Sequence, residues 1–146
     1  MKKFSLLLIS ILLLSCSRTD SDSETSTNPI VGKWQKDKYA TKKYPFSTAV
    51  EQDCGLPECE NKYTLELTSN NTYKRLEYDG PSCNSLSTSQ GNYVYDNKEN
   101  TLKIDESEYE IVLSKSELKL ISYSNYGCQG SAVGQYQLIM TYKKIN

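Results

Sequence analysis

The sequence contains no histidine among its 146 residues, and this absence removes whole classes of catalytic site. Ser-His and Cys-His nucleophile pairs both need an imidazole base, so this chain can assemble neither of them. A glycine-rich phosphate loop is also missing, because the segment Gly127-Cys128-Gln129-Gly130 has too few glycines in register. We therefore expect no enzyme activity and no cofactor.

The chain also lacks any excess of positive charge. It has 17 basic and 18 acidic residues, a formal net charge of −1. Nucleic-acid-binding domains carry a basic patch or stripe, so we expect no nucleic acid as a partner. Polybasic stretches that would attract anionic lipid headgroups are absent as well.

No apolar run is long enough to span a membrane as a helix, which takes about 18 residues or more. The longest run, residues 4–14, follows Lys2 and Lys3 and has the length of a secretory signal core. It ends in Leu13-Leu14-Ser15-Cys16, which resembles the lipobox of bacterial lipoproteins. The resemblance implies a signal peptide over residues 1–15 and a mature chain that starts at a lipidated Cys16, with palmitate among its acyl chains. An ordinary secretory signal with an unrelated cysteine is the alternative.

Residues 16–29 begin with this cysteine and continue as a polar segment that ends near Pro29. Such a segment cannot bury enough apolar surface to offset its ordering entropy, so we expect a disordered tether. The remaining residues, 30–146, have the size of one domain. The resemblance to lipoproteins places this domain outside the cytoplasm. We expect it to be anchored by lipid to the outer membrane of a Gram-negative bacterium, on the periplasmic or the outer surface.

The domain has an alternating pattern of apolar and polar residues, and turn signals interrupt it too often for helices. In residues 108–113, for example, Tyr109, Ile111 and Leu113 share one face, while Glu108 and Glu110 share the other. This pattern predicts antiparallel strands with one buried and one solvated face. Eight strands are expected, at residues 31–39, 62–68, 72–78, 91–96, 101–104, 108–113, 117–123 and 135–143. The fold class is therefore all-β, an eight-stranded up-and-down barrel, with a β-sandwich as the alternative.

The connections between these strands differ in length. In up-and-down order, the three short turns lie at one end of the barrel. The three long connections, residues 40–61, 79–90 and 124–134, lie at the other end. We expect a closed end and an elaborated open end.

Short motifs along residues 30–146 resemble the lipocalin-like domains of Bacteroidetes lipoproteins. Gly32 and Trp34 match a Gly-x-Trp motif on the first strand, and residues 63–73 match a Tyr-containing hairpin. Gly91, Tyr93 and Tyr95 match a later strand motif, although asparagine replaces the usual hairpin glycine. The resemblance implies an eight-stranded barrel in which Trp34 fills the closed end.

Four cysteines remain after Cys16, namely Cys54, Cys59, Cys83 and Cys128. An even number in an exported protein favours disulfides over free thiols. A zinc site is disfavoured because paired knuckles are missing, and no Cys-x-x-Cys redox motif occurs. All four cysteines fall in the long connections at the expected open end.

The hairpin at Asn70-Asn71 is expected to pair Leu65 with Leu76, a register that brings Cys59 and Cys83 close to opposite positions. Lipocalin-like sequences also tend to place one cysteine before this hairpin and one after it. We therefore predict Cys59–Cys83 and Cys54–Cys128. The alternative joins Cys54 to Cys59 and Cys83 to Cys128.

Two functions remain. An eight-stranded barrel can hold one small ligand, and its tyrosines would give an amphiphilic molecule both apolar and polar contacts. Side chains can also fill such a barrel, and it would then act as an envelope inhibitor or accessory subunit that contacts another protein through its loops. The loop residues available for such contacts are Tyr39, Tyr44, Phe46, Leu56 and Tyr126. The expected barrel lining is Trp34, Tyr63, Leu65, Tyr73, Tyr93, Tyr109, Ile111, Leu118, Leu120, Leu138 and Met140.

Overall fold

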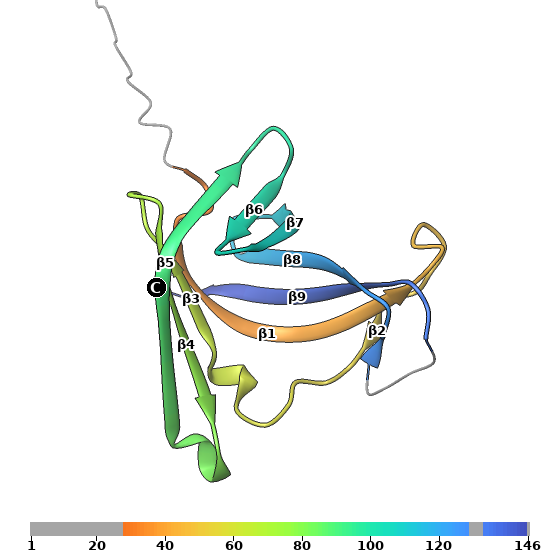
Figure 1. The fold of residues 1–146 in the computed structure, drawn as a ribbon, viewed down its shortest axis with the longest axis horizontal. Helices are drawn as coiled ribbons and strands as arrows, with labels where there is room; N and C mark the ends of the chain where they lie inside the picture. The colour runs from red at the N-terminus through yellow and green to blue at the C-terminus, as the bar shows by residue number, and fades with distance from the viewer. Residues whose placement is uncertain (1–27, 129–132, 146) are drawn as a thin grey trace, which may run out of the picture.

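The structure is a computed structural model that describes residues 28–128 and 133–145. The elements that lie wholly within these ranges are strands and two short 3₁₀ turns (Figure 1). The strands are β1 (Gly32–Lys43), β2 (Gln52–Asp53), β3 (Thr64–Leu67), β4 (Thr72–Asp79), β5 (Ser85–Asp96), β6 (Thr101–Ile104), β7 (Ser107–Leu113), β8 (Glu117–Ser124) and β9 (Tyr136–Ile145). The 3₁₀ turns are η1 (Glu60–Lys62) and η2 (Pro81–Cys83).

Eight of these strands form a closed antiparallel barrel. Hydrogen bonding runs from β1 through β3 to β9 in sequence order, and β9 then pairs with β1. The closing ladder extends from Lys33 opposite Ile145 to Lys43 opposite Tyr136. The predicted all-β barrel is confirmed, and the alternative sandwich is wrong. Strand β2 was not expected, and it adds two residues beside Ala40 and Thr41 at the far end of β1.

The structure corrects two predicted strand boundaries. Residues 79–90 were expected to be a long loop, but β5 begins at Ser85 and pairs with β4 rung by rung up to Asn92. Residues 85–90 are serine, threonine and glutamine apart from Leu86, and they show no apolar alternation because both faces of this stretch are exposed. Likewise, β1 continues to Lys43 instead of ending at Tyr39, since β9 accompanies it to that point.

The register of the β3–β4 hairpin also differs from the prediction. Leu65 lies opposite Arg75, not opposite Leu76. The turn holds Asn71 in the left-handed region at φ 61°, and the Thr72 carbonyl accepts a hydrogen bond from the Thr68 N–H at 3.0 Å. Because strand residues alternate between faces, this one-residue difference turns Arg75 inward and Leu76 outward.

The core lies at the end of the barrel where the chain enters. Trp34 is fully buried there, and its indole N–H donates a hydrogen bond to the Ile30 carbonyl at 2.9 Å. Leu65 faces Trp34 across the β1–β3 ladder, and Leu67 faces Tyr73 across the next pair of strands. The buried cluster consists of Ile30, Trp34, Leu65, Leu67, Tyr73, Tyr93, Leu102, Ile104, Ile111, Leu118, Leu120 and Tyr142.

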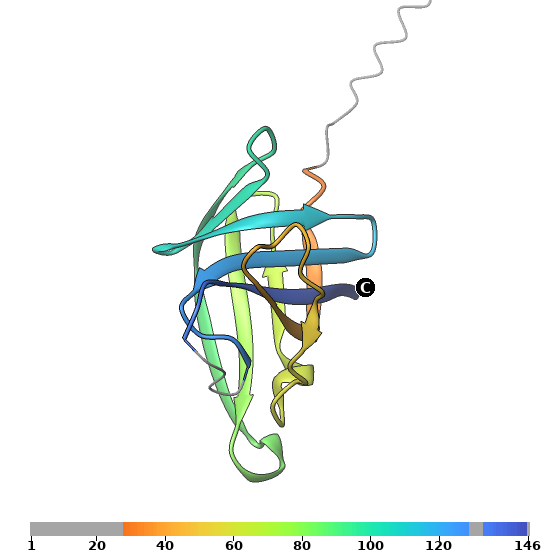
Figure 2. The same ribbon diagram turned by 90° about the vertical axis from the view of Figure 1, so that its right-hand side faces the viewer.

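Beyond the core, the barrel separates into two arms. β5 pairs with β6 only from Tyr93 to Asp96, and its pairing over 85–92 is with β4. β8 pairs with β7 only up to Ile121. As a result, β4 and β5 run downward in Figure 1, while β8, β9 and β1 run to the right. Figure 2 shows the same divergence from the side.

Two disulfides fix the loops at the far ends of the arms. Cys59 is bonded to Cys83, which joins the segments before β3 and after β4. Cys54 is bonded to Cys128, which joins the segments after β2 and β8. Both pairs have Cα atoms 5.3 Å apart, and this connectivity is the one that the sequence analysis preferred.

Removing either disulfide should lower the free energy of unfolding, and the longer link should matter more. The separations are 74 residues for Cys54–Cys128 and 24 for Cys59–Cys83. Chain entropy then gives losses of about 4.5 and about 3.5 kcal/mol for the two double Cys→Ser variants. Urea denaturation of both variants beside the oxidised parent measures these losses. Free thiols in the folded, unreduced parent would contradict the assignment.

Candidate ligand-binding face

The inner face of the two arms changes from apolar to polar beyond the core. Two residues after Trp34, Lys36 points inward opposite Tyr142 of β9. On β4, Arg75 occupies the inward position next to Leu65. Tyr39 lies opposite Met140, and Met140 lies opposite Leu120 on β8. We call this set, Lys36, Tyr39, Tyr63, Arg75, Tyr109, Met140 and Tyr142, the inner polar face.

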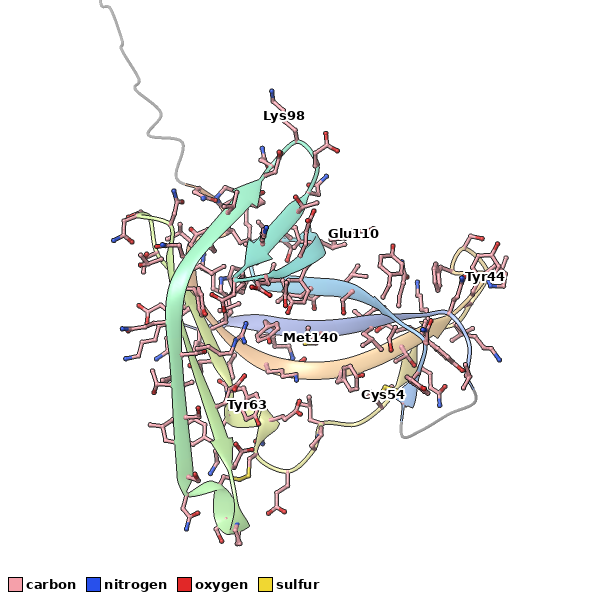
Figure 3. The ribbon with its side chains drawn as sticks, in the orientation of Figure 1. Tyr44, Cys54, Tyr63, Lys98, Glu110 and Met140 are labelled. Carbon is pink, nitrogen blue, oxygen red and sulfur yellow. A yellow bond between two sulfur atoms is a disulfide. The ribbon has the colours of Figure 1, made fainter. Side chains whose placement is uncertain are left out.

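A β-bulge in β1 shapes this face. The register with β9 shifts between Lys36 and Lys38, so Asp37 is the extra residue. Because of the bulge, Lys36 and Tyr39 both face inward although they are three positions apart. Figure 3 shows Tyr63 and Met140 on the sides of the arms that face each other.

Lys36 forms the most buried ion pair of the inner polar face. Its side chain is 9% exposed, and its ammonium group pairs with the Glu60 carboxylate of η1. The same ammonium lies 5.7 Å from the centre of the Tyr39 ring and 5.6 Å from that of Tyr63. Cation–π contacts of this kind stabilise a partly desolvated charge. Lys36 is therefore neutralised inside the protein.

The positive charge of Arg75 is neutralised less completely than that of Lys36. Its guanidinium lies 5.7 Å from the centre of the Tyr73 ring. The nearest carboxylate oxygen belongs to Glu77, at 3.9 Å, and the two side chains are 30% and 39% exposed. At that distance the two groups attract each other without a hydrogen bond.

Tyr142 is the most buried phenol of the inner polar face. Burial raises its pKa to about 12, and the nearby Arg75 charge acts in the opposite direction. Tyr109, Glu77 and Glu60 add to the increase in pKa. Tyr142 therefore stays protonated at physiological pH and keeps an O–H donor inside the barrel.

The structure places the predicted lining residues in two groups. Several lie in the buried core: Trp34, Leu65, Tyr73, Tyr93, Ile111, Leu118 and Leu120. Tyr109 and Met140 pack against this core, and Tyr63 and Leu138 are half-buried. The core end of the barrel is filled by side chains.

The polar inner residues were missed by the sequence analysis. A period of two would have identified Lys36 from Trp34, Arg75 from Tyr73 and Tyr142 from Met140. The expected lining contains aromatic and aliphatic residues alone, so it leaves out the two charged residues, Lys36 and Arg75. Tyr39 is the last residue of the first expected strand and was counted among the contact residues of the loops, and the β-bulge before it breaks the alternation that would have marked it as inward.

A second feature is an aromatic groove at the far end of the β8–β9 arm. It has a volume of about 430 Å³ and is lined by Tyr44, Phe46, Tyr123, Ser124, Asn125, Gln135 and Tyr136. Phe46 packs between Tyr44 and Tyr123, with ring centres at 5.6 and 5.8 Å. The Tyr123 hydroxyl donates to Glu110 at 2.8 Å and accepts from Gln137 at 3.2 Å. These contacts hold exposed rings in fixed positions.

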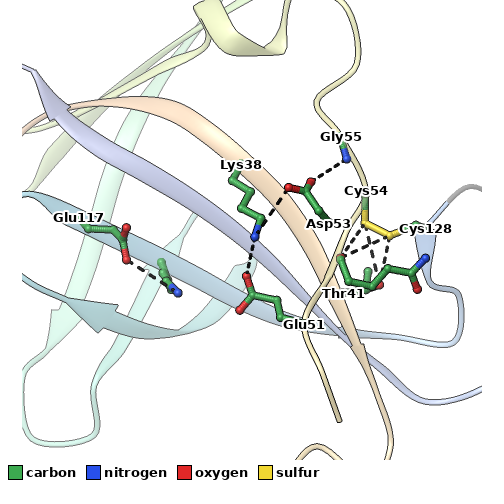
Figure 4. Close-up of polar contacts among 10 residues, drawn as sticks. Lys38, Thr41, Glu51, Asp53, Cys54, Gly55, Glu117 and Cys128 are labelled. Carbon is green, nitrogen blue, oxygen red and sulfur yellow. Dashed lines mark hydrogen bonds and ion pairs between the residues drawn. A yellow bond between two sulfur atoms is a disulfide. The ribbon is translucent and has the colours of Figure 1, made fainter.

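The loop between this groove and the barrel is fastened by polar contacts (Figure 4). Lys38 pairs with Glu51 at 3.3 Å and with Asp53 at 3.8 Å, and Asp53 accepts a hydrogen bond from the Gly55 N–H. The buried Thr41 hydroxyl donates to the Cys128 sulfur at 3.2 Å, since a disulfide sulfur carries no proton. The segment around Cys54 is thus fixed by both covalent and polar links.

Cys16 and the signal peptide lie outside the described residues, so lipidation stays a prediction. Over residues 28–128 and 133–145, no helix is long and apolar enough to cross a membrane. Within the same ranges, no three His, Cys, Asp or Glu side chains gather closely enough to hold a metal ion.

Comparison with known families agrees with the barrel topology. Residues 30–120 match the model of the lipocalin-like domain. The chain belongs to this family. No curated protein and no solved structure matches it. The lipocalin-like barrel is consistent with a ligand-binding role, and the match covers β1 to β7 and the start of β8.

The raised pKa of Tyr142 predicts a pH dependence of stability. The unfolded phenol loses its proton near pH 10, whereas the folded one keeps it up to about pH 12. Between these values Tyr142 should by itself lower the free energy of unfolding by up to about 1.4 kcal/mol per pH unit. The fall should be smaller in Tyr142→Phe, and urea denaturation across this range measures it. The exposed Tyr126→Phe is the control, and equal behaviour of the two variants would contradict the assignment.

Proposed function

We propose that this lipocalin-like protein is a lipid-anchored envelope protein that binds a small amphiphilic ligand on the inner polar face. One observation carries the proposal. Half-buried apolar and tyrosine side chains, including Tyr39, Tyr63 and Met140, lie between an apolar core and solvent. A ligand there would place apolar groups against Met140 and Leu120 and polar groups against tyrosine hydroxyls.

The position of the two arms supports this location. The core end is filled by Trp34 and its neighbours, so it offers little room for a ligand. The other end carries the disulfide-fixed segments at Cys59 and Cys54, which hold the approach to the inner polar face in a constant shape. A preformed site binds with a smaller ordering cost.

The proposed anchor comes from the sequence. The polar residues 17–29 would link a lipidated Cys16 to β1, which starts at Gly32. The barrel would then sit close to the membrane, from which an amphiphile can be delivered.

A bulky side chain on the inner polar face should block binding. Native mass spectrometry of the protein purified from its own cells should show a retained small-molecule adduct, and Met140→Trp should lose it. Val112→Trp is the matched control, because Val112 is 56% exposed on strand β7, which does not pair with β9. An absent adduct in the parent, or one that survives Met140→Trp, would contradict the proposal.

A second candidate function is contact with another envelope protein through the aromatic groove. Tyr44 and Tyr123 are 63% and 57% exposed, yet Phe46 and Glu110 hold them in place. Rigid, exposed aromatic residues are typical of interaction hot spots.

The two candidates predict different losses. If a protein partner uses the groove, Tyr44→Ala with Tyr123→Ala should abolish a copurifying protein and leave a small-molecule adduct intact. Affinity purification of the anchored protein after mild crosslinking measures this. Val50→Ala serves as control, because Val50 is 87% exposed and does not line the groove. Retention of the same partner by the double variant would exclude the groove.

A further inference from the structure

Strand β5 has an unpaired edge along its first eight residues. Residues 85–92 pair with β4 on one side, whereas β6 pairs with β5 only from Tyr93 to Asp96. In the described ranges, no other strand pairs with β5. Residues 85–90 are all exposed, and Figure 1 shows this part of β5 beside β4 in the arm that runs downward. One edge of the arm is therefore accessible to another strand.

The hydrogen-bond pattern identifies the main-chain groups on this edge. The Tyr93 N–H donates to the Asn71 carbonyl at 2.9 Å, which extends the β4–β5 ladder by one rung. In an antiparallel ladder, alternate residues of a strand direct their N–H and C=O groups to opposite neighbours. The odd-numbered residues of β5 therefore bond to β4. Leu86, Thr88 and Gln90 direct their N–H and C=O groups to the open edge.

The outer end of β4, on the opposite side of the arm, is covered by the chain itself. The Tyr63 hydroxyl donates a hydrogen bond to Asp79, the last residue of β4, at 3.3 Å. The Cys59–Cys83 disulfide also joins the segment before η1 to the segment after β4. Within the described part of the chain, this arm thus has a long open edge on β5 alone.

The open edge lacks the features that normally protect one. Native proteins block the edges of sheets with charged residues, proline or bulges. Residues 85–92, Ser-Leu-Ser-Thr-Ser-Gln-Gly-Asn, contain no charged residue and no proline, and their register with β4 is unbroken. Leu86 is 54% exposed at this edge. An added strand would pair the main-chain groups and cover part of this leucine.

A second copy of β5 fits this edge. Homodimers are commonly built around a two-fold axis, which places the same surface of each copy against the other. With Thr88 on the axis, the two copies of Thr88 lie opposite each other, and Leu86 lies opposite Gln90 of the second copy. No charge opposes this pairing, and threonine pairs across antiparallel strands are favourable. The exposed N–H and C=O groups of the two copies would form about six hydrogen bonds.

We propose that the protein forms a two-fold symmetric dimer through residues 85–92, which joins the β4–β5 arms of two copies in one continuous sheet. Because one edge of each copy is used, pairing stops at two copies. A typical interface has about ten direct hydrogen bonds, so about six predict a weak dimer with a micromolar dissociation constant. The inference is independent of the proposed function.

Sedimentation equilibrium of the full chain tests the dimer, whose fraction should rise between about 1 and about 100 μM. Amide hydrogen exchange followed by NMR at the two concentrations locates the contact. The amides of Leu86, Thr88 and Gln90 should exchange more slowly at the higher concentration. Those of Ser87 and Ser89, which already face β4, should not change.

Substitutions of Thr88 test the pairing itself. Thr88→Pro removes the central N–H from each copy and should weaken the dimer by roughly tenfold to a hundredfold. Thr88→Lys places two like charges opposite each other and should weaken it by roughly fivefold to tenfold, with a smaller effect at high salt. Thr88→Ala keeps the main-chain groups and should have a much smaller effect. Circular dichroism checks that each variant is folded.

Val94→Lys is the matched control. Val94 is 65% exposed on the same strand, at a position where β6 pairs with the edge. A parent that stays monomeric at about 100 μM would overturn the proposal. A dimer that both Thr88→Pro and Thr88→Lys leave unchanged, or that Val94→Lys weakens as much as Thr88→Lys does, would also overturn it. So would unchanged exchange at Leu86, Thr88 and Gln90 in a dimeric sample, because the copies would then meet elsewhere.

Discussion

Strands β1 and β9 pair from Lys33 opposite Ile145 to Lys43 opposite Tyr136, and this ladder joins the first barrel strand to the last. It is the contact on which the remaining structure depends, because a meander without it would have two exposed edges. Closure places Trp34 against Leu65 on one side and the β9 strand on the other. The core cluster forms around that tryptophan, so the buried core depends on closure of the barrel.

The same ladder contains the irregularity that gives the interior its chemistry. The bulge at Asp37 interrupts the regular alternation of β1 and aims both Lys36 and Tyr39 inward. A regular strand would have placed one of them on the outer surface. The Lys36–Glu60 pair then links the barrel wall to η1, and the Cys59–Cys83 disulfide fixes η1 from its other side. Polar groups inside this barrel are thus held by covalent and ionic contacts together.

The core end of the barrel and its two arms have different roles. The core end is apolar and filled, and it supplies stability through the burial of large side chains. The arms contribute little to that core, so their inner faces can keep charged and phenolic groups near solvent. Arg75 and Glu77 lie there 3.9 Å apart, so the two charges attract each other without a hydrogen bond. The aromatic groove at Phe46 lies at the far end of the second arm, where Tyr44 and Tyr123 are exposed.

The sequence by itself indicated an all-β fold and the approximate strands, and together with the resemblance it favoured, without excluding the alternative, the disulfide connectivity that the structure displays. Alternation of apolar residues and frequent turns is a local signal, and it is strong in segments such as 101–104 and 108–113. The tertiary structure alone decided the β3–β4 register, which turns Arg75 inward, and the bulge at Asp37, which turns Tyr39 inward. Both are set by pairing with a partner strand, and a shift of one residue changes the face of every side chain beyond it. For this reason the apolar core could be predicted from the sequence, whereas the inward position of Tyr39 and the pairing of Arg75 with Leu65 could not.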